Sequence, residues 1–595
     1  MLTTKPYSAE THSAETHSAM TYRAVVQSPW LPVLLSAAMG GWLAYYLYGG
    51  LIDPRNVTWL LYENDPLQHY TGWHFFRRDE WQWPLGAMSN LASEVGTSIV
   101  YTDSIPLIAL PLKLFHSWLP DPFQYLGLVM LANLMLNASV ACALLQRCGV
   151  ERWPAFLGAV LFVSLPMATM RGLGAHGHEA LSAHWLLLLG FWLVLFHPYL
   201  SWQVAFRWLG LLAVAVLVHF YLFFMVGVLW GGWWLRAVWT SRAWHTPVDL
   251  RCGVFSALLT PLCIALLMWA AGYFHYGGDG GAGGGYGVFS AEVLTFFNPY
   301  SQAWFIEGGN LVSLSYFFPG WKTPVAGQYE GQAYAGLGGV GLMILGGVVI
   351  SRFGWRGSMQ YCPAALPWLL LLALGMFVFA LSDRVVLGYR LYELHFGQLL
   401  WPLSDILRSS GRLAWPLLYV VLIACVTLLA KAWPRKLHTW AMLVLVLLQW
   451  GDLRGWHQSV HDRLEARVDE TSEGHLPYAV LQAEELNELW DAKEQIIALP
   501  VDNLADLRPY TWLAAQHDMT INVAHLARVT PNTIEQATRT ERQRLEEGVV
   551  SENAVYVLTS PSWADKVCRM DDIQCQFFKP VTVAWKLAEP LNESE

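Results

Sequence analysis

Two acidic residues lie directly after the first long apolar stretch of the chain and are its clearest candidates for chemistry. Glu63 and Asp65 stand among aromatic residues that include Tyr62 and Trp73. Such neighbours lower the local polarity, and a partly desolvated carboxylate has a raised pKa and accepts a proton near neutral pH. The competing interpretation is a solvated loop with a turn at the Asp-Pro step. We expect a general base here, with Asp65 as the first choice.

Two more residues of the same segment extend this candidate site. Asp103 begins a second short stretch and supplies a third acid, while His69 follows the acidic pair and is expected to contact substrate. The segment that holds them, residues 53–121, is much longer than a connector needs to be. Loops of such length are usually functional or disordered.

Basic residues that suit a phosphate group occur at two other places. Arg408 and Arg412 are four residues apart, so a helix that begins there would present both on one face, next to serine and glycine amides. A helix N-terminus with two guanidinium groups is a ready phosphate site. Arg171 is an isolated cation that fits the same role. The alternative for the pair is contact with Asp405 or with lipid headgroups.

A cluster of histidines with an acid has the residue types of a metal site. His176, His178 and Glu179 could bind a divalent ion such as Mg²⁺ or Mn²⁺, with Glu63 or Asp65 completing the set. The spacing matches no zinc signature, and a polar loop with glycine-hinged histidines is the alternative. A divalent ion at these residues is the one cofactor that the sequence suggests, and no cofactor is certain from it.

Tyr329 and Glu330 are candidates for sugar binding. A carboxylate accepts hydrogen bonds from sugar hydroxyls, and a tyrosine ring stacks on a sugar ring. An ordinary aromatic belt at the membrane surface is the equal alternative. His219, between two apolar stretches, is expected to be a satisfied polar residue rather than a catalyst.

The composition places most of the chain in lipid. Of its 595 residues, 55% are hydrophobic and 14% are charged, against roughly 25% charged in soluble domains. The chain has no long basic patch for nucleic acid. A spanning helix needs about 20 apolar residues. Eleven stretches approach this: residues 29–50, 122–146, 154–170, 180–197, 206–219, 221–238, 252–272, 334–350, 364–382, 412–430 and 437–450.

Loop charge predicts the orientation of this mainly α, polytopic membrane bundle. With eleven spans, most loop arginines and lysines fall on one side, which the positive-inside rule makes cytoplasmic. The other side then holds the first outer loop, with its two short interfacial helices, and a long loop at 273–333. That loop opens with a glycine run at 277–285, which is expected to be mobile. Residues 1–28 read as a disordered cytoplasmic tail ahead of the transmembrane domain, 29–451.

Residues 452–595 are charged and read as a small soluble α/β domain on the outer side. Cys568 and Cys575 lie within it and form a local disulfide in an oxidising compartment, the alternative being two free thiols. The expected strands are residues 496–500, 520–523 and 555–558. The expected helices are residues 477–493 and 531–548.

Several motifs resemble a known group of enzymes. An acidic motif after the first span, two short helices before the second and an outer C-terminal domain resemble the GT-C glycosyltransferases, which use polyprenyl-phosphate-linked sugars. More narrowly, residues 29–450 look like an uncharacterised bacterial family of multispan membrane proteins near them. The stretches that carry this likeness are Asp65-Pro-Leu-Gln-His-Tyr-Thr-Gly-Trp73, Tyr101-Thr-Asp-Ser-Ile-Pro106, Gly327-Gln-Tyr-Glu-Gly331 and Arg408-Ser-Ser-Gly-Arg412.

The resemblance implies roles for the candidate residues. Asp65 matches the loop acid that serves GT-C enzymes as base, Glu63 stands in their acidic pair, and Asp103 matches a second loop acid of some members. The acidic metal motif of oligosaccharyltransferases is not reproduced. The expectation is an inverting glycosyltransferase in the bacterial inner membrane with a periplasmic C-terminal domain. Its partners would be a polyprenyl-phosphate-linked sugar and a glycan, lipid or protein acceptor, with membrane lipids around it. The alternatives are a flippase for lipid-linked sugars and a non-catalytic scaffold for envelope assembly.

Overall fold

The structure is a computed structural model that describes ten stretches of the chain. They are residues 28–61, 65–171, 177–240, 247–275, 285–300, 313–472, 483–499, 507–527, 531–578 and 581–587. Glu63, His176 and nearly all of the glycine run at 277–285 lie outside them, so the predictions for those residues stay predictions.

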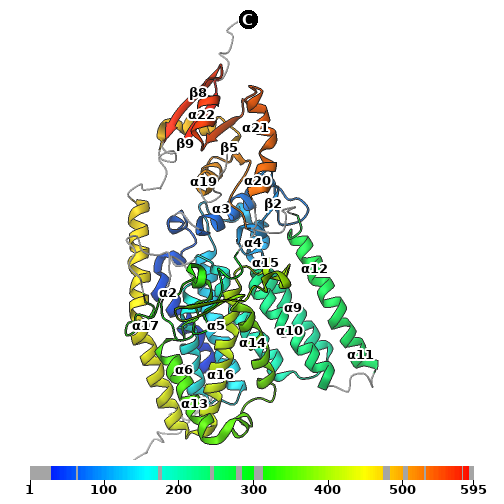
Figure 1. The fold of residues 1–595 in the computed structure, drawn as a ribbon, viewed down its shortest axis with the longest axis vertical. Helices are drawn as coiled ribbons and strands as arrows, with labels where there is room; N and C mark the ends of the chain where they lie inside the picture. The colour runs from blue at the N-terminus through cyan, green and yellow to red at the C-terminus, as the bar shows by residue number, and fades with distance from the viewer. Residues whose placement is uncertain are drawn as a thin grey trace, which may run out of the picture.

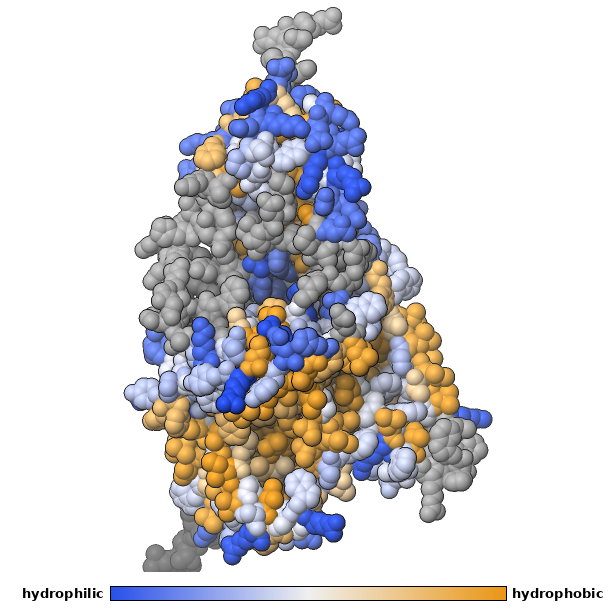
Figure 2. Space-filling model, in the orientation of Figure 1, coloured by the Kyte–Doolittle hydropathy of each residue, from blue (hydrophilic) through white to orange (hydrophobic). Residues whose placement is uncertain are grey.

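Apolar helices form one end of an elongated molecule, and a small α/β domain forms the other (Figure 1). Within the described ranges, seven helical segments are long and apolar enough to cross a membrane: Trp30–Ile52, Leu126–Arg147, Glu179–Phe196, Phe220–Thr240, Arg251–Ala271, Gly336–Met359 and Ser410–Ala432. Hydrophobic side chains dominate the surface of this end, and hydrophilic ones that of the other (Figure 2). The predicted mainly helical architecture with apolar helices suited to a membrane is therefore confirmed, while the number of eleven spans stays a prediction.

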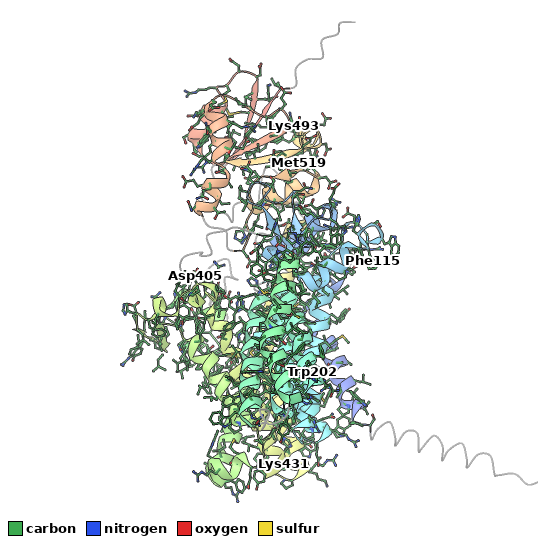
Figure 3. All side chains as sticks on the ribbon, turned by 90° about the vertical axis from the view of Figure 1, so that its right-hand side faces the viewer. Phe115, Trp202, Asp405, Lys431, Lys493 and Met519 are labelled. Atoms are coloured by element: carbon green, nitrogen blue, oxygen red, sulfur yellow. A yellow bond between two sulfur atoms is a disulfide. The ribbon has the colours of Figure 1, made fainter. Side chains whose placement is uncertain are left out.

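Each expected apolar stretch is nevertheless helical. The helices of this part are α2 (Trp30–Tyr48), α5 (Leu126–Arg147), α6 (Arg152–Val163), α7 (Pro166–Thr169), α8 (Trp185–Phe196), α9 (Trp202–Val218), α10 (Phe220–Thr240), α11 (Pro247–Val254), α12 (Thr260–Ala271), α13 (Gly336–Met359), α14 (Leu366–Ala380), α16 (Trp415–Ala432) and α17 (Arg435–Ser472). The backbone of His219 is extended, so α9 and α10 are separate helices. Figure 3 places Lys431, at the end of α16, far from Lys493 and Met519 in the C-terminal domain.

Small residues allow the closest contact between two of these helices. A Cβ atom at Gly40 of α2 would lie 2.3 Å from the carbonyl oxygen of Leu134 in α5, so only glycine fits there. Close backbone approach at small residues is how helices associate in lipid, where the hydrophobic effect does not hold them together.

The outer segment between α2 and α5 folds into two helices, as predicted. They are α3 (Asp65–Arg78) and α4 (Pro106–Lys113), with the short hairpin of β1 (Ala87–Met88) and β2 (Thr97–Ser98) between them. Nearly all of α3 is buried, including polar His69 and His74. It is therefore enclosed by protein rather than lying open at an interface.

The C-terminal domain is a five-stranded sheet of order β6-β5-β7-β9-β8 with helices packed on it. Its elements are α18 (Asn487–Asp491), β5 (Gln495–Leu499), α19 (Arg508–Gln516), β6 (Thr520–Ile521), α20 (Pro531–Ala537), α21 (Arg539–Glu546), β7 (Ala554–Leu558), α22 (Pro561–Val567), β8 (Ile573–Phe578) and β9 (Val581–Lys586). Strand β5 is parallel to β6 and β7, whereas β9 is antiparallel to β7 and β8. The three predicted strands are present, and β8 and β9 were not foreseen.

Two further features of this domain bear on the predictions. The disulfide between Cys568 and Cys575 is formed, as expected. The predicted boundary at residue 452 lies inside α17, so the α/β fold itself begins after that helix.

The C-terminal domain is docked on the outer segment by backbone hydrogen bonds. The Ile521 amide donates to the Asn90 carbonyl at 3.0 Å, and the Ser93 amide donates to the Ile521 carbonyl at 2.9 Å. Residues 90–94 thus extend the sheet at its β6 edge, and α19 packs on α3. This docking brings side chains of the last domain to the N-terminus of α3.

Candidate functional site

Asp65 is the first residue of α3 and lies where the helical part meets the C-terminal domain. Its Oδ2 atom is 3.2 Å from Nε2 of His178, and its Oδ1 accepts a hydrogen bond from Nη2 of Arg508 at 3.1 Å. The Asp65 side chain is 37% exposed, so it is half-buried and remains accessible. The prediction of a partly desolvated carboxylate at this place is confirmed.

The predicted raised pKa of this carboxylate is wrong. Burial raises the pKa of Asp65, but the hydrogen bond and charge of His178 and the charges of Arg508 and His69 outweigh burial and hold the pKa well below its usual range. Neighbouring cations favour the charged form of an acid more than desolvation disfavours it. The carboxylate is therefore ionised at neutral pH and is a stronger acid than we expected.

Asp103 approaches the same place from the segment before α4. Its backbone is left-handed, with φ of 54°, and its Oδ1 is 3.9 Å from Nε2 of His219. Burial raises the pKa of Asp103, but the charges of His219, His69, His178 and Arg412 lower it overall. His219, expected to be a bystander, thus faces one of the candidate acids.

His69 lies one turn after Asp65 on α3, with its side chain only 2% exposed. Its Nδ1 is 2.9 Å from Oε2 of Glu179, and its ring lies 5.8 Å from that of His178. Burial lowers the pKa of His69, yet the hydrogen bond and charge of Glu179 and the charges of two aspartates raise it overall. The role of Glu179 as a metal ligand is therefore not supported, because this carboxylate is engaged with the imidazole.

Two of the predicted phosphate ligands meet a predicted sugar ligand instead. Arg412 binds both carboxylate oxygens of Glu330, with Nε 2.8 Å from Oε2 and Nη2 2.9 Å from Oε1. Arg171 reaches Oε2 of Glu330 at 2.8 Å and its carbonyl oxygen at 3.1 Å. All three side chains are at most 7% exposed. We call this group the Glu330 triad; its net charge is +1.

Glycines permit this pairing. A Cβ atom at Gly411 would lie 2.6 Å from Cα of Gly331, so the two short segments that carry Arg412 and Glu330 pass backbone against backbone. Burial alone would raise the pKa of Glu330, but the two arginines hold it well below its usual range. Both guanidinium groups are thus directed at an acid, and a phosphate-binding role for Arg412 and Arg171 stays a prediction.

Arg408 differs from Arg412 in both setting and partners. Leu407 and Ser409 have non-helical backbone angles, so the two arginines do not share a helix face as predicted. Arg408 is half-buried, and it makes no ion pair with any described residue, Asp405 included. Its charge helps to lower the pKa of His525, as does that of Arg508. It is therefore a cation near the docked domain.

Tyr329 lies within electrostatic range of both the Glu330 triad and Asp65 on α3. Burial raises its pKa to about 12, and the charges of both Glu330 and Asp65 act in the same direction. The ring lies edge-on to Phe289, with 6.1 Å between ring centroids. Most of the predicted site residues within the described ranges are therefore gathered in one region. They are Asp65, His69, Asp103, Arg171, His178, Glu179, Tyr329, Glu330 and Arg412.

Sequence reasoning missed the contribution of the last domain. Arg508 contacts Asp65 across 443 positions of the chain, and Nδ1 of His525 bonds to Oε1 of Gln68 on α3. No local pattern distinguishes these residues from other polar residues of the domain. Only the docking of β6 and α19 on the outer segment brings them to the site.

Docking is expected to depend on pH through two histidines at this contact. Burial lowers the pKa of His74, which faces Trp512 of α19, and that of His525, each to about 4. The undocked residues titrate near 6.5, so the undocked state binds more protons between pH 6.5 and 4. The two histidines therefore leave the free energy of docking at its full value above about pH 6.5. On acidification that free energy becomes less favourable, by up to about 2 kcal/mol per histidine at pH 5.

Hydrogen exchange of α3 and α19, corrected for intrinsic rates, measures this effect. We expect faster exchange of both helices at pH 5 than at pH 7, and a smaller difference in the His74→Gln variant. Equal corrected protection at the two pH values would contradict the expectation.

The fold and the site define a class: a mainly helical protein with apolar helices suited to a membrane, whose polar site lies beneath a docked α/β domain. The chain belongs to the family described as Domain of unknown function (DUF6311), which matches residues 37–454, and its residues 485–583 match the DUF6311 C-terminal domain. Among curated proteins, none matches the chain.

Proposed function

We propose that the protein is a membrane glycosyltransferase of the GT-C type that moves a sugar from a polyprenyl-phosphate-linked donor to an acceptor. The observation that carries this proposal is the setting of Asp65, an accessible carboxylate at the junction of apolar helices and a polar domain. A base at such a junction can meet both a donor held by its lipid and an acceptor from water.

The orientation belongs to the same proposal. We place eleven spans in the bacterial inner membrane, with the C-terminal domain in the periplasm. A disulfide in that domain supports an oxidising compartment. The position of Lys431 at the opposite end supports a cytoplasmic side there.

Asp65 would act as general base in a single inverting displacement. It takes the proton of the acceptor hydroxyl while that oxygen attacks the anomeric carbon, and the polyprenyl phosphate leaves from the opposite face with its electron pair. The leaving phosphate needs no acid, so one carboxylate suffices, unlike the two of a glycosidase.

The depressed pKa of Asp65 has a consequence for this mechanism. An acid held by Arg508 and His178 is a weak base until those contacts loosen. A donor phosphate would compete with Asp65 for Arg508, because its oxyanions accept charge-assisted hydrogen bonds from a guanidinium and gain negative charge as the phosphate leaves. Donor binding would thus raise the pKa of Asp65 and strengthen the base only when the donor is present.

Arg408 is the second cation available to the donor. A charge-assisted hydrogen bond contributes about 1.5–3 kcal/mol, so Arg408→Gln is expected to raise the donor Kd by roughly 10–150-fold. Because Arg408 pairs with no described acid, the change leaves none of the described carboxylates without its ion-pair partner. Titration of the reconstituted protein with a short-chain polyprenyl-phospho-sugar measures this constant.

Arg390→Gln is the matched control, because Arg390 is an exposed residue of the hairpin formed by β3 (Arg384–Leu387) and β4 (Arg390–Glu393). It should bind the donor as the wild type does. An unchanged donor Kd in Arg408→Gln would remove Arg408 from the proposed site. Failure of the wild type to transfer sugar from any polyprenyl-phospho-sugar to glycan, lipid or peptide acceptors would contradict the proposed function itself.

A further inference from the structure

Two histidines of the site share an arrangement that the proposed function does not use. Each has one ring nitrogen held by a carboxylate: Nδ1 of His69 by Glu179 at 2.9 Å, and Nε2 of His178 by Asp65 at 3.2 Å. The other nitrogen of each ring, Nε2 of His69 and Nδ1 of His178, is buried and finds no hydrogen-bond partner in the described part of the chain. A buried nitrogen without a partner is costly, so its presence calls for an explanation.

The third member of the group is Asp103. One ligand atom from each of His69, Asp103 and His178 lies within 4.8 Å of the others. A tetrahedral ion with bonds of about 2.1 Å would draw such atoms to roughly 3.4 Å from one another. The ligand atoms would therefore have to come closer to one another by about 1.4 Å or less, the difference between 4.8 Å and roughly 3.4 Å.

The chain holds Asp103 against α3 by specific contacts. Ser104 donates a hydrogen bond from Oγ to the carbonyl oxygen of His69 at 2.7 Å. A Cβ atom at Gly72 would lie 2.3 Å from Oγ1 of Thr102, so glycine lets α3 lie directly on the Thr102–Ser104 turn. The backbone of Asp103 is left-handed at this turn.

We propose that His69, Asp103 and His178 bind one transition-metal ion, with Zn²⁺ as the best fit. Two imidazoles with one carboxylate suit zinc or iron, whereas Mg²⁺ and Mn²⁺ prefer oxygen ligands, so the earlier expectation of those two ions is not supported by these residues. Three protein ligands leave a fourth position open for water or substrate. The site stands whether or not the protein transfers sugars.

Glu179 and Asp65 take the place of outer carboxylates in this site. A metal-binding histidine commonly donates its second N–H to a carboxylate, which fixes the ring orientation and raises the basicity of the ligating nitrogen. This explains why the Glu179 carboxyl group, 1% exposed, is placed behind His69. Asp65 would then have two roles: it would orient the metal ligand His178, and it would remain accessible to substrate.

Metal content of the full-length protein tests the proposal without any substrate. The protein is purified without a polyhistidine tag, equilibrated with Zn²⁺ and desalted, and bound metal is measured by mass spectrometry. We expect about one zinc per chain. The variants His69→Gln, Asp103→Asn and His178→Gln are expected to lose it, and His395→Gln, a change at an exposed histidine, to keep it.

Two further measurements keep the test decisive if a ligand variant folds poorly. Glu179→Gln leaves the ligands in place and is expected to weaken zinc affinity by about 10–100-fold in competition with a chelator. Co²⁺ in place of Zn²⁺ should give the intense visible absorption of a tetrahedral ion in the wild type. Wild-type protein that binds no transition metal, or a folded Asp103→Asn variant with wild-type zinc content, would overturn the proposal. Neither result affects the outcome of the sugar-transfer assay, so the metal site and the proposed function can fail independently.

Discussion

Asp65→Asn is expected to lower sugar transfer by about 10²–10⁴-fold, the contribution of a positioned general base. Asparagine has nearly the same shape and keeps an oxygen that accepts the hydrogen bond of Arg508. It has no basic site for the proton of the acceptor, so the chemical step suffers, whereas donor binding is not weakened because a neutral amide competes less with the donor phosphate for Arg508. The reconstituted protein, assayed with a labelled polyprenyl-phospho-sugar, gives kcat and KM separately.

A purely structural Asp65 makes a different prediction. Its hydrogen bond from Arg508 joins the helical part to the docked domain, so the loss of this bond would loosen the docking. In that case the loss of activity would follow the loss of protection of α3 and α19 in hydrogen exchange. We expect instead unchanged protection with a lowered kcat. Asp565→Asn, at an exposed position of α22, is the matched control and should be fully active.

The helical part of the fold could be predicted because apolar length is a local property of the chain. Every expected span contains a helix, and the strands β5 and β7 follow from short runs of buried β-branched residues. Strand β8 was missed because it is partly polar and contains Cys575 of the disulfide. The disulfide could be predicted because its two cysteines are close in the sequence.

The residue types of the site could be predicted, but their pairings could not. Glu330 and Arg412 are 82 positions apart, and nothing in either neighbourhood indicates that one neutralises the other. The sign of the pKa shift of Asp65 depends on the same kind of information. Burial was inferred correctly from its aromatic neighbours, but Arg508 arrives from a domain whose docking is a tertiary property.

Glu330→Gln is expected to be the most destabilising single change in the helical part. It leaves the guanidinium groups of Arg171 and Arg412 buried together without their common acid, and removing one partner of a buried ion pair costs about 3–5 kcal/mol. Neither group can reach water to recover this energy, since both are nearly fully buried. The midpoint of thermal unfolding of the detergent-purified protein should fall accordingly.

The double variant Glu330→Gln/Arg412→Gln separates this electrostatic effect from a loss of packing. Removing Arg412 as well takes away one of the two unpaired cations, so the double variant should be more stable than the sum of the two single changes predicts. Coupling in a contacting pair is usually 0.5–3 kcal/mol in size, and we expect the upper part of that range because the bond is bidentate. Strictly additive losses would mean that each residue acts through packing alone, and the Glu330 triad would then have no energetic meaning.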